Sequence, residues 1–170
     1  MSTNYAIALM LASVACATDL RTRRIPNVLT FGGAAVGFAF HVFAPGGNGL
    51  FASGAGWLVG VAVFFVPFAL GGLGAGDIKL MAALGAWLGP MDIAWTAVYT
   101  AMAGGVLAIV VAAASGYLRQ VLSNVWMLLC HWSVAGLRPL HELSLEGSNG
   151  PRLAYALPIL VGVMCAVWLR

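Results

Sequence analysis

Charged residues are scarce in this chain. Only 8% of its 170 residues are Asp, Glu, Lys or Arg, whereas soluble globular domains carry roughly 25%. Hydrophobic residues make up 62%, and no run of Lys or Arg is long enough to form a nucleic-acid-binding surface. The composition excludes an ordinary soluble domain and predicts a protein that lies in a lipid bilayer and binds no nucleic acid.

Cysteine pairs and metal-binding clusters are also missing. Cys16, Cys130 and Cys165 are far apart, form no Cys-x-x-Cys pair and have no His at the spacing of a metal site. We therefore expect neither a disulfide framework nor a bound metal, and no motif in the sequence indicates another cofactor.

The apolar residues are grouped in six segments that are separated by polar or turn-forming connections. A membrane-spanning helix needs about 20 apolar residues, so a chain of this length holds several spans. We expect a single all-α integral membrane domain over residues 1–170, with about six transmembrane helices. The first segment lacks a basic stretch before it, so we expect a retained helix and not a cleaved signal. The expected helices cover about residues 4–18, 28–43, 50–70, 78–88, 93–117 and 152–169.

Three details of this layout matter below. The segment 78–88 is short for a full span, so it must tilt, extend backwards or be shielded by its neighbours. Asp92 is placed like an N-cap of the segment after it. The polar stretch 118–151 begins with an amphipathic pattern in which Trp126 and Trp132 suit a membrane interface. We expect a helix there, either along the membrane surface or as a lid over a site.

The basic residues fall on one side of the six-span layout. The connections at 44–50 and 89–92, on the other side, carry no Lys or Arg. Under the positive-inside rule the basic side faces the cytoplasm and both termini lie outside. Asp19 and Asp77 then lie at cytoplasmic helix ends. The basic residues on this side are Arg21, Arg23, Arg24, Lys79, Arg119, Arg138 and Arg152.

Two carboxylates in one membrane leaflet indicate a function. A charged residue costs about 2.5–3.5 kcal/mol at the centre of a membrane helix and less near its ends, so such residues usually face protein or water. If Asp19 and Asp77 meet, both cannot ionise comfortably and the pair holds one proton. The ionised member can then take a proton from an attacking water while the protonated member donates to a peptide carbonyl. This is the chemistry of an aspartic protease.

Other interpretations of the two residues stay open. Asp19 can close the first helix and pair with a nearby arginine. Asp77 can be an N-cap, with Lys79 reaching the membrane interface. The chain can also be a carboxylate-dependent transporter or proton relay, or a non-catalytic assembly subunit of the membrane. The glycines at 71, 72, 74 and 76 favour a site, because they remove side chains around Asp77.

Two motifs give the chain a family resemblance. Residues 74–77 read Gly-Ala-Gly-Asp and continue as "IKL", while Asp19 is followed, after four intervening residues, by "RIPN" at 24–27. With both motifs at this spacing, the sequence resembles the type IV prepilin peptidases, membrane-embedded aspartic proteases with a Gly-x-Gly-Asp motif.

This resemblance implies an activity and a set of site residues. A prepilin peptidase removes a short basic leader from prepilins or pseudopilins, usually behind a glycine, at the cytoplasmic face of the inner membrane, where the pilus-assembly machinery is a further partner. The catalytic pair is then Asp19 and Asp77. Asn27 is equally consistent with a turn or cap residue. The residues expected to support the motifs or bind substrate are Gly74, Gly76, Lys79, Arg24, Pro26 and Asn27.

The resemblance also implies what this chain does not do. Larger members carry a cytoplasmic domain with paired cysteines and methylate the new N-terminus of the product. No such insertion follows the first segment here, and cysteine pairs are absent. The chain looks like the short, peptidase-only branch associated with Tad/Flp-type pili, and we expect no N-methyltransferase activity.

Overall fold

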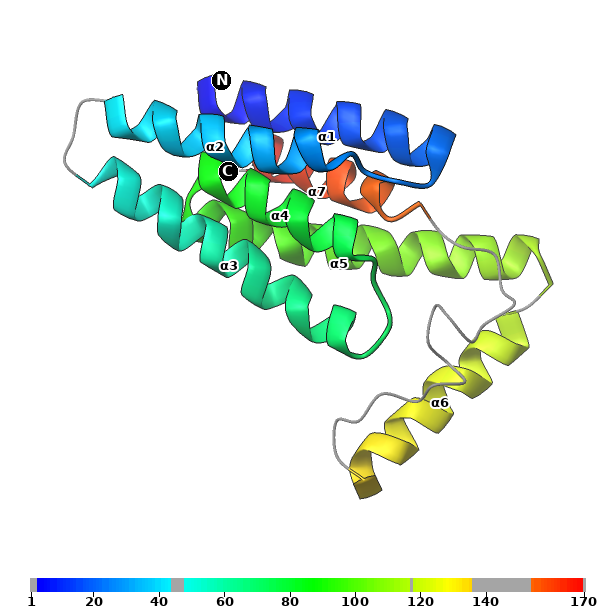
Figure 1. Cartoon of the computed structure of the whole chain (residues 1–170). Coiled ribbons are helices and arrows are strands. Elements are labelled where there is room, and N and C mark those ends of the chain that lie inside the picture. The colour runs from blue at the N-terminus through cyan, green and yellow to red at the C-terminus, as the bar shows by residue number, and fades with distance from the viewer. Residues whose placement is uncertain (1–2, 44–47, 117, 136–153, 170) are drawn as a thin grey trace.

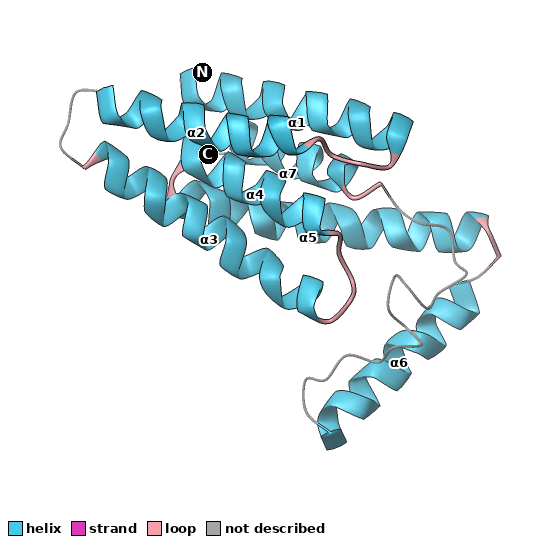
Figure 2. Ribbon diagram, viewed as in Figure 1, coloured by secondary structure: helices cyan, strands magenta, loops and turns pink. Residues whose placement is uncertain are grey.

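The computed structural model describes residues 3–43, 48–116, 118–135 and 154–169, and within these ranges it contains seven helices and no strand (Figure 1; Figure 2). All α-helical structure agrees with the sequence-based expectation. The helices are α1 (Thr3–Thr22), α2 (Asn27–Phe43), α3 (Gly49–Ala69), α4 (Ala75–Leu88), α5 (Pro90–Ala114), α6 (Leu118–Ala135) and α7 (Ala156–Leu169).

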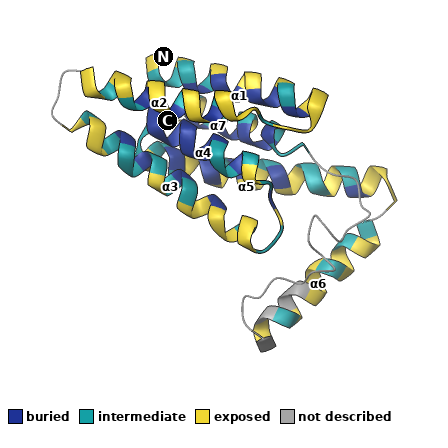
Figure 3. Cartoon of the chain, in the orientation of Figure 1, coloured by how far each residue is buried: buried dark blue, intermediate teal, exposed yellow. Residues whose placement is uncertain are grey.

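Helix α4 lies at the centre of the bundle. It packs against α1, α2, α3 and α5, and every residue from Leu80 to Trp87 is buried (Figure 3). A helix that is apolar on all sides is stable where other helices surround it. The shortness of this segment is thus explained by shielding, and by an earlier start at Ala75.

Small residues allow the helices around α4 to approach closely. A Cβ added to Gly56 of α3 would overlap the carbonyl oxygen of Gly85 in α4, and one on Gly60 would overlap the carbonyl of Met81. Close backbone approach at small residues is a common way to pack helices in a membrane, where apolar burial drives association weakly. Glycines therefore hold α3 against the central helix.

Three helix boundaries differ from the sequence-based expectation in ways that affect function. Helix α1 continues to Thr22, so Asp19 lies in its last turn, and α4 begins at Ala75, so Asp77 lies in its first turn. The expectation that Asp92 is an N-cap was wrong. Pro90 begins α5 after Gly89 because proline suits the first helical position. The Asp92 carboxylate instead accepts a hydrogen bond of 2.5 Å from the Tyr5 hydroxyl.

Not every expected span is long enough to cross a bilayer by itself. Helices α1, α3 and α5 have the length and composition for it, whereas α2 and α7 are shorter apolar helices. The chain is a membrane protein with several apolar helices, and the count of six spans stays a prediction. Arg138 and Arg152 lie outside the described residues.

Helix α6 stands apart from the bundle and contacts mainly α5 (Figure 1). The expected helix in this region is confirmed. Its Leu122 and Trp126 side chains are exposed, as an amphipathic helix in contact with lipid headgroups would require. Its position at the membrane interface stays a prediction.

One end of the bundle collects the segments that carry the two motifs. Helices α1, α3 and α5 end there, and α2, α4 and α7 begin there (Figure 1). The α1–α2 and α3–α4 connections consequently lie at the same end, together with Asp19 and Asp77.

The close packing of α3 on α4 gives a test of the fold. The substitution Gly56→Ala should lower the free energy of unfolding by about 1–3 kcal/mol, because the methyl group must displace the α4 backbone. Thermal unfolding in detergent measures it. Gly54→Ala is the matched control, since a Cβ at Gly54 would meet nothing within 4 Å. Equal melting temperatures for the two variants would contradict the α3–α4 packing.

Candidate active site

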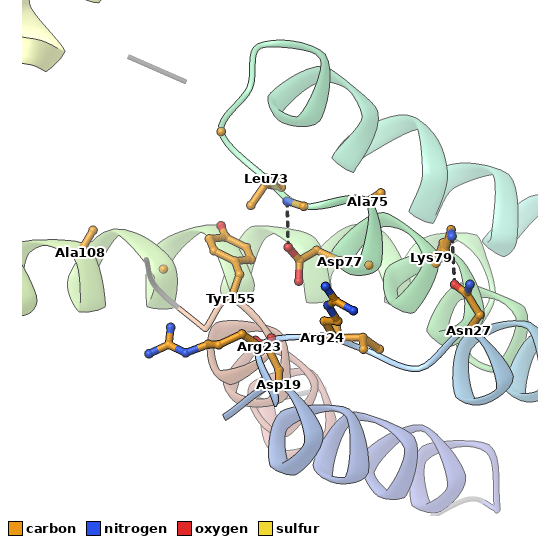
Figure 4. Close-up of a pocket in the computed structure, with 15 residues that line it drawn as sticks. Asp19, Arg23, Arg24, Asn27, Leu73, Ala75, Asp77, Lys79, Ala108 and Tyr155 are labelled. Carbon is orange, nitrogen blue, oxygen red and sulfur yellow. Dashed lines mark hydrogen bonds between the residues drawn. The ribbon is translucent and has the colours of Figure 1, made fainter. Parts of the chain in front are cut away.

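A cavity of about 650 Å³ opens at the motif-bearing end of the bundle (Figure 4). Its lining comes from α1, the α1–α2 connection, the start of α2, the α3–α4 connection, α4, α5 and the residue before α7. Both aspartates of the expected pair belong to it. The lining residues are Asp19, Arg23, Arg24, Ile25, Asn27, Gly72, Leu73, Gly74, Ala75, Gly76, Asp77, Lys79, Gly104, Ala108 and Tyr155.

Asp19 enters the cavity from the last turn of α1. Its side chain is buried, with 9% of the residue exposed, and its Oδ2 accepts a hydrogen bond of 3.4 Å from the backbone N–H of Ala156. Ala156 is the first residue of α7, and the free N–H groups of a helix start favour a carboxylate. The beginning of the last helix thus supports the carboxylate at the end of the first.

The chain turns sharply after Asp19. Arg23 has a φ of 55°, in the left-handed region that is uncommon for residues other than glycine. Its N–H donates to the Asp19 carbonyl oxygen at 2.8 Å and so closes α1. The side chains of Arg23 and Arg24 then leave the connection in different directions, with Arg24 pointing toward Asp77 (Figure 4), and both line the cavity.

Asp77 enters the same cavity from the first turn of α4. It is 8% exposed, and its Oδ2 accepts a hydrogen bond of 3.1 Å from the N–H of Gly74, the residue that precedes the helix. This is the acceptor half of a capping box. Asp77 is therefore not the N-cap itself, but its carboxylate does cap a free N–H of the helix start.

The glycines before Asp77 serve different purposes. Gly71 has a φ of 79°, which favours glycine in the turn that leaves α3. A Cβ on Gly74 would lie 3.2 Å from Asp77 Oδ2 and would crowd the carboxylate. At Gly76 an added Cβ would lie 3.4 Å from Ile25, an ordinary contact distance. Close approach thus explains Gly74, whereas Gly76 faces the cavity without a steric requirement for glycine.

A hydrogen bond joins the two motifs. Lys79 Nζ donates to Asn27 Oδ1 at 3.0 Å, and the same ammonium group lies 5.2 Å from the centre of the Phe31 ring. Pro26 does not line this cavity. Its carbonyl oxygen accepts from the N–H groups of the first turn of α2 at 3.1 and 3.3 Å, so it helps to begin that helix.

The two carboxylates have matching environments. Each uses Oδ2 to accept one backbone N–H, and within the residues that the structure describes neither Oδ1 has a hydrogen-bond partner. Each carboxylate therefore has one oxygen that can bind water or substrate in the cavity that both residues line. Over the same described ranges, no group of three or more His, Cys, Asp or Glu side chains is placed to bind a metal ion.

A comparison with protein-family models decides the family. The model of the type IV leader peptidase family matches residues 6–109, more than half of the chain. The chain belongs to this family. The resemblance recognised from the two motifs is thus confirmed, and membership marks the protein as a membrane peptidase. Searches of curated proteins and of solved structures found no match.

Sequence reasoning missed the contribution of α5 and of the start of α7. Gly104, Ala108 and Tyr155 line the cavity and Ala156 binds Asp19, yet none was among the expected site residues. Tyr155 and Ala156 also lie beyond the region that the family model matches. The order of the spans could have indicated the start of α7, because with six spans the last apolar segment begins at the same end as the two motifs.

The bond between Lys79 and Asn27 can be tested with a double-mutant cycle. Lys79→Ala and Asn27→Ala should each destabilise the protein, and the double variant should lose about 1 kcal/mol less than the sum, because only one shared bond is lost. Unfolding in detergent measures the three variants. Additive effects, to within about 0.3 kcal/mol, would contradict the contact.

Proposed function

We propose that this protein is an aspartic endopeptidase that removes the short basic leader of prepilins or pseudopilins, with Asp19 and Asp77 as its catalytic pair. One observation carries the proposal. Two aspartates that are 9% and 8% exposed line one cavity, in a chain of the leader peptidase family. Leader peptidases act on prepilins, which supplies the substrate class.

The proposed reaction is hydrolysis of one peptide bond. The ionised aspartate takes a proton from water while the water oxygen bonds to the carbonyl carbon, and the protonated aspartate gives its proton to the carbonyl oxygen. The tetrahedral intermediate then collapses. Its carbon–nitrogen bond breaks as the aspartate that took a proton from water gives it to the leaving amine. The other aspartate takes a proton from a hydroxyl group of the intermediate as the C=O bond re-forms, so the pair again holds one proton.

The site is proposed to face the cytoplasm from a single six-span membrane domain. Arg21, Arg23, Arg24 and Lys79 all lie at the end of the bundle that holds the cavity. The described residues of the opposite connections carry no Lys or Arg. The positive-inside rule then directs the cavity to the cytoplasm. We further propose that the product is not methylated by this protein.

The catalytic roles predict the effect of three isosteric variants. Asp19→Asn and Asp77→Asn should each abolish leader removal from a co-expressed prepilin, because neither variant can share a proton and activate water. Asp92→Asn is the matched control at the opposite end of the bundle, and it should retain cleavage. Immunoblots of membrane fractions report substrate, product and enzyme together.

Two outcomes would overturn the proposed function. Continued cleavage by both Asp19→Asn and Asp77→Asn would leave the dyad without a catalytic role. Ion or proton flux in reconstituted vesicles that depends on Asp77, in a protein that cleaves no prepilin, would instead favour the proton relay.

The cytoplasmic orientation can be measured by thiol labelling. In a variant with its three native cysteines replaced by Ala, Thr22→Cys should react with a membrane-impermeant maleimide only after the inner membrane is opened. Asn48→Cys, at the other end of the bundle, should react in cells with a permeable outer membrane only. Both positions are exposed. The reverse labelling pattern would mean that the cavity faces outward.

A further inference from the structure

Tyr155 adds a phenol group to the cavity that the two aspartates line. It directly precedes α7 and lines the same cavity as Asp19 and Asp77 (Figure 4). The next residue, Ala156, donates its N–H to Asp19. The backbone that supports one carboxylate therefore also fixes the position of the Tyr155 ring.

Two neighbouring helices define where that ring lies. The Tyr155 ring and the Phe64 ring of α3 form an edge-to-face pair, with ring centres 6.3 Å apart. On another side it rests on Gly104 of α5, where an added Cβ would lie 2.9 Å from the hydroxyl oxygen and 3.2 Å from two ring carbons. Any larger residue at position 104 would displace the phenol, so Gly104 gives α5 a recess that holds the ring.

This packing fixes the position of the Tyr155 hydroxyl group, which has no hydrogen-bond partner among the described residues. Tyr155 is half-buried, and buried phenol groups normally have such a partner. Burial, and next the charge of Asp77, raise the pKa of the Tyr155 phenol above its ordinary value, so the phenol is protonated at neutral pH and can donate a hydrogen bond. A donor without a partner in the proposed active-site cavity fits a substrate acceptor.

We propose that Tyr155 is a third catalytic residue, whose hydroxyl donates a hydrogen bond to the carbonyl oxygen of the scissile peptide bond. The proposal rests on the function proposed above. When the water oxygen bonds to the carbonyl carbon, electrons of the C=O bond move to the oxygen, which becomes a stronger acceptor. Tyr155 keeps its own proton, and the aspartate pair carries out the proton transfers. The hydrogen bond strengthens in the transition state, so its main effect is on kcat.

The variant Tyr155→Phe tests this role because it removes only the hydroxyl and keeps the ring that packs on Phe64 and Gly104. With purified enzyme and a prepilin substrate, kcat should fall by roughly 10- to 100-fold, as for loss of one donor to a developing oxyanion, while KM changes little. Tyr99→Phe is the matched control. Tyr99 stacks on Trp95 in α5 outside the cavity, and its variant should keep the wild-type kcat.

The outcomes separate this inference from the proposed function. A kcat for Tyr155→Phe within twofold of wild type, or a loss seen only in KM, overturns the role of Tyr155. The function itself stands in that case if Asp19→Asn and Asp77→Asn are inactive. Should Tyr155→Phe be unstable in detergent, Gly104→Ala keeps the hydroxyl but displaces the phenol. It must lower kcat too, and an unchanged kcat for that variant also overturns the proposal.

Discussion

The burial of two carboxylates at one end of an apolar bundle is the constraint on which the rest of the structure depends. An ionised carboxylate away from water is unfavourable unless hydrogen-bond donors replace its hydration. Each one here receives a backbone N–H at a helix start, Asp19 from Ala156 and Asp77 from Gly74. Helix α7 therefore begins beside the end of α1, whereas the bond from Gly74 to Asp77 lies within the start of α4 itself.

The same arrangement gives the site a rigid base. Asp77 belongs to a helix that is surrounded by protein and held at glycine contacts by α3, and the Lys79–Asn27 bond ties its first turns to α2. Groups placed on packed helices hold their geometry better than groups on loops. The cavity above them has a volume of about 650 Å³, and it is lined by glycines where side chains would otherwise narrow it. A stable scaffold and an accessible site thus come from the same residues.

Much of this could be predicted from the sequence, because apolar runs and Gly or Pro breaks are local signals. They located every described helix and both motifs. The start of α4 was misjudged because it depends on the capping contact from Gly74 to Asp77. The role of Asp92 was misjudged because its carboxylate binds the side chain of Tyr5, which is 87 positions away. Contacts between distant residues were beyond such reasoning. The bond from Ala156 to Asp19 spans 137 positions, and no local pattern indicates that Tyr155 fits over Gly104.

The central claim is that both aspartates act together on one tetrahedral intermediate. A leader peptide whose scissile amide is replaced by a hydroxyethylene group imitates that intermediate and cannot be cleaved. Its dissociation constant, measured with wild type, Asp19→Asn, Asp77→Asn and Asp92→Asn, tests the claim most directly. The account predicts affinity losses of roughly 100-fold or more in each of the first two variants and none in the third. Equal affinity in all four proteins would contradict a joint catalytic role for Asp19 and Asp77.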